Sequence, residues 1–81
     1  MWTVYLLKSS KKRWYYVGST NDVVRRLAEH NAGKVSSTKH HRPLQIVFEK
    51  VFEDEIIARR YELRAKKQRL LKERIIRTIE L

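Results

Sequence analysis

Two tyrosines near the start of the chain are the first side chains that could do chemistry. Tyr5 lies in the apolar run 2–8, and Tyr16 lies in a second run that leads directly to Gly18. The polar segment 9–13 between the runs is short enough for a hairpin, which would place both phenols side by side on one face of a sheet. Because the chain has no cysteine, its catalytic candidates are Tyr, His, Arg, Lys and carboxylates, which serve acid–base and electrostatic catalysis.

An arginine and a histidine follow at helical spacing. Arg26 comes ten residues after Tyr16, and His30 comes four residues after Arg26. A separation of four residues puts two side chains on the same side of a helix. We expect Gly18 to end the second strand and to let the chain turn directly into this helix, so that the strand ends and one helix face converge. The guanidinium of Arg26 has the permanent charge and the bidentate geometry that suit a phosphoryl oxygen.

The elements that must position these side chains follow from hydrophobic periodicity and from capping and turn residues. The sequence predicts a single α/β (α+β) domain over residues 1–81, in which a small three-stranded antiparallel sheet is flanked by helices in the order β-β-α-β-α-α. The expected elements are strands over 2–8, 14–17 and 44–52, a helix that follows the capping cluster 19–22 and ends at 31–33, a loop over 34–43, and helix from 54 onward with a break near 66–69.

The apolar side chains of the last predicted helix leave two arrangements open. If the helix folds back, these side chains join the core. If it does not, they form a dimer face or a docking surface for a partner. The residues concerned are Leu71, Ile75, Ile76 and Ile79.

The charge balance narrows the choice of partners. Nineteen Lys and Arg residues against nine Asp and Glu residues give a net charge of +10, which attracts polyanions such as nucleic acid. An anionic membrane surface is the competing partner, but the broken apolar stripe of the last helical segment argues against it. No apolar run approaches the roughly 20 residues of a membrane-spanning helix. The lack of cysteine excludes disulfide scaffolds and thiolate metal sites, and it favours a cytoplasmic location.

The tyrosines, the arginine and the histidine together resemble the GIY-YIG nuclease family. The two half-motifs of the family appear as Thr3-Val4-Tyr5 and Tyr16-Val17-Gly18, and its helix arginine falls on Arg26. The histidine or tyrosine one turn later falls on His30, and the metal-binding glutamate falls on Glu62. The resemblance covers nearly the whole chain and is strongest to minimal stand-alone bacterial members, which are similar to the N-terminal catalytic domain of an excision-repair nuclease. Thr3 replaces the first glycine of the family name, which removes backbone room but no reacting group.

This resemblance implies an endonuclease that depends on Mg²⁺ or Mn²⁺ and hydrolyses DNA phosphodiester bonds in repair or recombination. By resemblance, Glu62 holds the metal ion, Tyr16 is the general base and Arg26 binds a phosphoryl oxygen. Tyr5 and His30 are expected to form hydrogen bonds around the phosphate and the attacking water. The expected products carry a 5′-phosphate and a 3′-hydroxyl.

The polar loop 34–43 is expected to contact the nucleic-acid backbone through its cations and hydroxyls. The chain is too short for a separate module that reads sequence beside the catalytic core, so specificity is expected from DNA shape or from a protein partner. The candidate nucleic-acid contacts are Lys34, Thr38, Lys39, His40 and Arg42.

Each candidate catalytic residue also has an explanation that involves no chemistry. Tyr5 and Tyr16 are typical core aromatics of strands, and His30 near a helix C-terminus interacts favourably with the helix dipole. Arg26 is typical of a solvated helix face, and Glu62 has a lysine four residues later for a salt bridge. The alternative function is therefore a non-catalytic nucleic-acid-binding module with the same fold.

Overall fold

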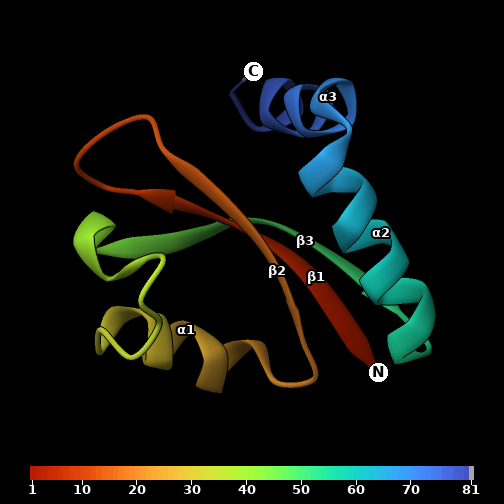
Figure 1. Cartoon of the computed structure of the whole chain (residues 1–81), viewed down its shortest axis with the longest axis horizontal. Helices are drawn as coiled ribbons and strands as arrows, with labels where there is room; N and C mark the ends of the chain where they lie inside the picture. Colours follow the sequence, from red (N-terminus) through yellow and green to blue (C-terminus); the bar gives the residue numbers. More distant parts are fainter. Residues whose placement is uncertain (81) are drawn as a thin grey trace.

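One antiparallel sheet of three strands forms the centre of the computed structural model, which describes residues 1–80 (Figure 1). The strands lie in the order β2-β1-β3, so β1 is central and the other two are edges. The predicted fold class and the order β-β-α-β-α-α are confirmed. The elements are β1 (Trp2–Ser9), β2 (Tyr15–Thr20), α1 (Val23–Asn31), the 3₁₀ turn Lys39–His41, β3 (Leu44–Phe52), α2 (Glu55–Lys67) and α3 (Arg69–Glu80).

Helices cover both faces of the sheet (Figure 1). Because side chains alternate along a strand, Tyr5 and Leu7 of β1 point to the face on which α1 packs through Leu27. Val4 and Leu6 point to the opposite face, where α2 and α3 pack. The tyrosine of the first half-motif therefore lies on the α1 side.

Helix α3 folds back onto the sheet. Ile75 and Ile76 are buried in the core beneath it, and Leu71 and Ile79 pack against the same cluster. The first of the two arrangements predicted for these side chains is therefore confirmed.

Strand β2 runs further than the sequence suggests. The prediction that Gly18 ends this strand is wrong, because β2 begins at Tyr15 and continues through Gly18 to Thr20. Gly18 lies opposite Tyr5 in the ladder, and a Cβ atom at this position would overlap the Tyr5 phenol. The turn into α1 comes at Asp22, whose side chain accepts the capping hydrogen bond of the helix (3.1 Å).

The remaining boundaries agree with the predictions. Strand β3 covers residues 44–52, and the break between α2 and α3 falls at Gln68, whose backbone is extended.

Asn31 fixes the end of α1 to β3, because its side-chain amide donates to the carbonyl oxygen of Leu44 (2.9 Å) and its oxygen accepts from the Leu44 N–H (2.8 Å). Within residues 1–80, no helix has the length and apolar character needed to cross a membrane.

Candidate active site

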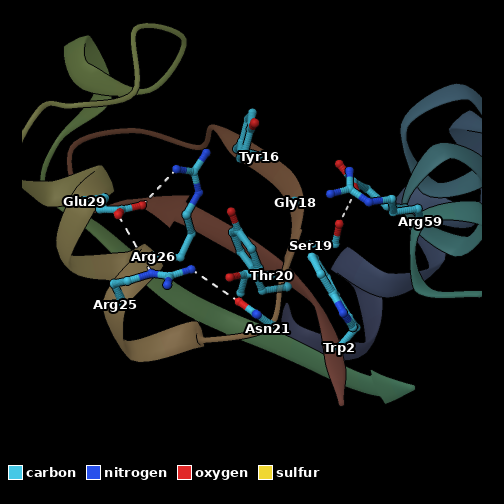
Figure 2. A pocket seen from close by; sticks show the side chains of 12 residues that line it. Trp2, Tyr16, Gly18, Ser19, Thr20, Asn21, Arg25, Arg26, Glu29 and Arg59 are labelled. Atoms are coloured by element: carbon cyan, nitrogen blue, oxygen red, sulfur yellow. Dashed lines mark hydrogen bonds and ion pairs between the residues drawn. The ribbon is translucent and has the colours of Figure 1, made fainter. Parts of the chain in front are cut away.

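A cavity of about 320 Å³ lies at the β2 edge of the sheet (Figure 2). Helix α1 contributes one wall and α2 contributes another, and side chains of β1 and β2 lie between them. Gly18, the predicted structural residue, also lines this cavity. Four of the five predicted catalytic side chains line it, and they are Tyr5, Tyr16, Arg26 and Glu62.

A buried hydrogen-bond chain orients Tyr5. Its hydroxyl lies 2.9 Å from Nε2 of His30, and Nδ1 of the same ring lies 2.8 Å from Oγ1 of Thr38. Oγ1 of Thr38 also lies 3.4 Å from the carbonyl oxygen of Val35. Each ring nitrogen of His30 therefore has a hydroxyl partner, and the guanidinium of Arg26 contacts the Tyr5 hydroxyl from the side of the cavity.

Burial keeps both partners of this hydrogen bond uncharged at neutral pH. Loss of solvation raises the pKa of Tyr5 to about 12, although the nearby guanidinium of Arg26 acts in the opposite direction. Burial also lowers the pKa of His30, and the positive charge of Arg26 lowers it further. A neutral phenol that is held in place by His30 suits the orientation of a water molecule better than its deprotonation.

Tyr16 is the more accessible of the two tyrosines. It lies on the same face as Tyr5, displaced by two residues along β2 from the Tyr5–Gly18 pair. Its ring meets His30 edge-on, with centroids 5.4 Å apart and planes at 62°. The ammonium of Lys66 lies 5.4 Å from the Tyr16 centroid. The predicted placement of both phenols on one face is confirmed.

Arg26 reaches the cavity from α1 (Figure 2). Its Nη1 pairs with Oε1 of Glu29 at 2.9 Å, and 34% of its side chain is exposed. This ion pair fixes the guanidinium on one side and leaves further N–H groups for an anion. Its neighbour Arg25 lines the cavity as well, where it donates to Oδ1 of Asn21 (3.3 Å).

Glu62 brings a carboxylate to the cavity from α2, and its side chain is only 16% exposed. One of its oxygens accepts a hydrogen bond from the Ser19 hydroxyl. The other oxygen pairs with Nζ of Lys66 at 2.8 Å. The salt bridge to Lys66, which would explain Glu62 without a catalytic role, is therefore present. Glu62 lines the cavity all the same.

Comparison with known proteins identifies the family. The GIY-YIG catalytic domain matches residues 1–74 of the chain. The chain belongs to the GIY-YIG family. Among its relatives are UPF0213 proteins of Listeria monocytogenes (44% identical over 64 residues, which cover 78% of this chain and 71% of the relative) and of Staphylococcus aureus (38% identical over 78 residues, which cover 88% and 94%). The solution NMR structure of a UPF0213 protein from Bacillus halodurans is similar as well, with a TM-score of 0.58 and 31% identity over 96% of this chain and 85% of that one.

The resemblance to this nuclease family, predicted from the residues, is confirmed. The two half-motifs of the GIY-YIG name meet at one pair of the β1–β2 ladder, Tyr5 with Gly18. Thr3 pairs with Thr20, which lies beyond the second half-motif. Gly18 is required for a steric reason, since it leaves the space that the Tyr5 phenol fills. Thr3 stands where the family has a glycine, and the strand pairing is maintained there.

The donor set of this GIY-YIG cavity fits one Mg²⁺ held by a single carboxylate. Mg²⁺ keeps several waters and is bound by one or two carboxylates together with substrate phosphates. Glu62 supplies a carboxylate, and Lys66 is a flexible, 41% exposed side chain that an arriving cation would displace. Glu29, the second carboxylate of the cavity, is engaged by Arg26. Over the described residues, no group of three or more His, Cys, Asp or Glu side chains is placed to hold a metal ion, so water and substrate phosphate would have to complete its coordination.

Two predicted contacts with the substrate do not fit the burial of their side chains. His30 is 0% exposed and has hydroxyl partners at both ring nitrogens, so it contacts Tyr5 and does not face the cavity. Thr38 is also 0% exposed, and its hydroxyl contacts His30.

The other predicted nucleic-acid contacts do not line the candidate site. Lys39 and Arg42 line a separate hollow of about 380 Å³ together with Lys11 of the hairpin. Lys34 and His40 are both exposed. These four side chains could therefore contact a DNA backbone only outside the cavity that contains the GIY-YIG motif.

Seven residues that line the cavity were not predicted as site residues, and they are Trp2, Ser19, Thr20, Asn21, Arg25, Glu29 and Arg59. Ser19 follows Gly18 directly, and strand alternation would have sent it toward α2 had the strand been extended to Thr20. Trp2 and Arg59 carry no local signal, because the packing of α2 beside the start of β1 brings them together.

Proposed function

We propose that the chain is an endonuclease that depends on Mg²⁺ or Mn²⁺ and hydrolyses phosphodiester bonds of DNA. The observation that supports this proposal is the convergence of four side chains from four elements on one cavity. Core packing or surface solvation alone gives no reason for two phenols, a guanidinium and a carboxylate to meet there. The four side chains are Tyr5 of β1, Tyr16 of β2, Arg26 of α1 and Glu62 of α2.

Each group has a separate task in the proposed reaction. Arg26 binds a non-bridging oxygen of the scissile phosphate and offsets the charge that develops there. Tyr16 is the proposed general base and takes the proton of the attacking water at its oxygen atom, on the side of the cavity where the ammonium of Lys66 lies 5.4 Å from its ring centroid. Tyr5, fixed by His30, accepts a hydrogen bond from that water and sets its direction of attack.

Glu62 would hold the divalent ion beside the phosphate. When bound, the ion supplies positive charge that polarises the scissile phosphate and assists the departing oxygen. We propose that the products carry a 5′-phosphate and a 3′-hydroxyl. We further propose that the substrates are repair or recombination intermediates in the cytoplasm, with specificity set by DNA shape or by a protein partner.

A non-catalytic DNA-binding module is the second candidate. It is favoured by the engagement of both Glu62 oxygens, one by Ser19 and the other by Lys66. The net charge of +10 would give either function a salt-dependent affinity for DNA. The two candidates differ in their need for a metal ion.

The test is a cleavage assay with labelled single-stranded, duplex, flap and four-way-junction DNA in Mg²⁺, Mn²⁺ or EDTA. Glu62→Gln removes the carboxylate charge from the cavity, and Arg26→Ala removes the phosphate-binding guanidinium. Glu73→Gln is the matched control, because Glu73 lies on α3 and pairs with Arg69 at 3.0 Å on the surface.

The proposal expects metal-dependent cutting that Glu62→Gln and Arg26→Ala abolish and that Glu73→Gln retains. Glu62→Gln should still bind DNA in EDTA. Cutting by Glu62→Gln at the wild-type rate would refute the role of this carboxylate. Binding of every substrate without cutting would establish the non-catalytic module instead.

A further inference from the structure

Trp2 forms a part of the cavity that the proposed reaction does not use (Figure 2). It is half-buried at the start of β1, where its ring packs on the edge of the core shared with α2. The guanidinium carbon of Arg59 lies 5.1 Å from the ring centroid. A large aromatic surface therefore lines the same cavity as the motif residues.

The groups around Trp2 are polar and cationic. Asn21, at the end of the β2 segment, brings a side-chain amide to the cavity. Arg25 and Arg59 line it from α1 and α2, and each side chain is 58% exposed. Aromatic, amide and guanidinium groups are the combination that binds a nucleotide, because the ring stacks on a base while the cations attract its phosphates.

The volume of the cavity agrees with such a ligand. At about 320 Å³ it falls at the lower end of the range of about 300–1,000 Å³ found for small-molecule sites. A single phosphate group with its cation does not need that room or an indole surface. A nucleotide unit beside the scissile phosphate uses both.

We propose that Trp2 is a stacking surface for the base of the nucleotide next to the scissile phosphate, with Arg25 and Arg59 on the adjoining phosphates. This inference rests on the proposed nuclease function and names its substrate class. A base inside a duplex has neighbours on both of its faces, so a base that stacks on Trp2 must be unpaired and displaced from its stack. The preferred substrate is therefore DNA that is single-stranded or locally unpaired at the cleavage point.

The two tryptophans of the chain allow a direct test by fluorescence. Trp14→Phe leaves Trp2 as the only emitter, and Trp2→Phe leaves Trp14. Trp14 is a matched control because it does not line the cavity and because both His41 (centroids 3.7 Å apart, planes at 6°) and Tyr16 (6.3 Å, 18°) stack on its ring. Each variant is titrated in EDTA with a short oligothymidylate, with an abasic strand of equal length and with a blunt duplex.

We expect oligothymidylate to quench the emission of Trp2 and to leave that of Trp14 nearly unchanged. The abasic strand has the same phosphates without bases, so it should bind without quenching Trp2, and the blunt duplex should quench Trp2 weakly. Quenching of Trp2 by the abasic strand, or quenching by the duplex equal to that by oligothymidylate, would overturn the proposal. Quenching confined to Trp14 would overturn it as well.

A binding measurement adds a second readout. Trp2→Leu keeps an apolar side chain at the core edge but removes the stacking surface, so oligothymidylate should bind on the order of 5- to 150-fold more weakly, with abasic-strand affinity unchanged. Equal loss for both strands would indicate a role in packing only and would refute stacking. The fluorescence and binding experiments contain no metal ion, so they test the subsite independently of cleavage. Quenching of Trp2 by oligothymidylate in a protein that does not cut DNA in Mg²⁺ or Mn²⁺ would retain the subsite and reject the nuclease. Cutting in the metal-containing assay without such quenching would reject the subsite and retain the nuclease.

Discussion

The hydroxyl of Tyr5 forms a hydrogen bond of 2.9 Å with Nε2 of His30, and both residues are at most 2% exposed. The tyrosine of the first half-motif is thus held by a fully buried histidine. Thr38, from the loop after α1, fixes the far side of the imidazole at 2.8 Å. The orientation of one cavity-lining phenol therefore depends on a loop residue that lies behind it.

This relationship predicts that Thr38→Val will affect stability and cutting but not DNA affinity. Valine matches the shape of threonine but leaves Nδ1 of His30 without its hydrogen-bond partner, which costs about 1–3 kcal/mol of unfolding free energy. The loosened imidazole no longer fixes Tyr5, so the cleavage rate at saturating DNA should fall. Denaturant unfolding, DNA binding in EDTA and single-turnover cleavage measure the three quantities.

Lys39→Ala is the contrasting variant, because Lys39 lines the separate hollow beside Arg42. It should keep the unfolding free energy within about 0.5 kcal/mol of the wild type. It should also reduce the slope of log affinity for DNA against log salt concentration by about 1, as expected for the loss of one phosphate contact. If Thr38→Val instead weakened DNA binding with no loss of stability, Thr38 would be a direct DNA contact after all.

Gly18→Ala should be far more harmful to activity than its loss of stability suggests. The added Cβ overlaps the Tyr5 phenol, so Tyr5 must shift, at a cost of about 1–3 kcal/mol of unfolding free energy. A catalytic group displaced by about 1 Å loses about a hundredfold in rate. Cleavage rates at saturating DNA, together with unfolding curves, measure both effects.

Gly33→Ala supplies a control of similar thermodynamic size outside the cavity. Gly33 has φ +79°, a left-handed conformation that costs an alanine about 1–2 kcal/mol. We expect this variant to unfold more easily and to cut at the wild-type rate. Equal losses of cutting in the two variants would mean that stability, and not the position of Tyr5, limits activity.

The fold could be predicted from the sequence because its signals are local. The alternation of β3, the capping position of Asp22 and the change of apolar stripe near Gln68 each act within a few residues. The end of β2 could not be read in this way. Glycine commonly marks the end of a strand or a turn. Gly18 instead lies inside β2, where Tyr5 on the neighbouring strand requires a residue without a side chain.

The site could be predicted only where spacing alone determines position. The period of two along strands placed Tyr5 and Tyr16 on one face, and the period of the helix placed Arg26 near them. The depth of a side chain depends on long-range packing, which a spacing does not reveal. His30 and Thr38 are therefore buried, although both were expected at the substrate.

Lys66→Ala should increase the affinity of the cavity for divalent cations. The Lys66 ammonium contacts Glu62 at 2.8 Å and competes with a metal ion for the carboxylate. An exposed i,i+4 pair is worth about 0.3–0.5 kcal/mol, so its removal should tighten Mn²⁺ binding about twofold. Titration of Mn²⁺ in the absence of DNA, followed by electron paramagnetic resonance, measures this change directly.

Lys67→Ala removes the same charge from the next, exposed position of α2. It should leave Mn²⁺ affinity close to that of the wild type, and Glu62→Gln should reduce that affinity in every background. Weaker Mn²⁺ binding by Lys66→Ala would show that the lysine supports the metal site rather than competing with it.

The buried histidine also sets a pH dependence of stability. Burial, followed by the charge of Arg26, lowers the pKa of folded His30 below its ordinary value of 6.5. Burial and the charges of Lys12 and His40 lower the pKa of His41 in the same direction. Below pH 6.5 the unfolded chain therefore binds more protons than the folded chain, so stability falls as the pH drops. Lowered carboxylate pKa values, as at Glu80, act only below about pH 4.5.

We therefore expect His30→Gln to be less stable than the wild type at pH 7.5 and to lose less stability between pH 7.5 and pH 5.5. A glutamine amide offers both a donor and an acceptor to the hydroxyls of Tyr5 and Thr38 but does not titrate, so it removes the contribution of His30 to the slope. One proton accounts for at most about 1.4 kcal/mol per pH unit, and denaturant unfolding across this range resolves such a slope. His41→Gln, made in parallel, removes the contribution of the other shifted histidine, and the double variant should show the flattest profile. If the wild type and His30→Gln lost stability in parallel down to pH 5.5, His30 would not be the buried neutral group that holds Tyr5.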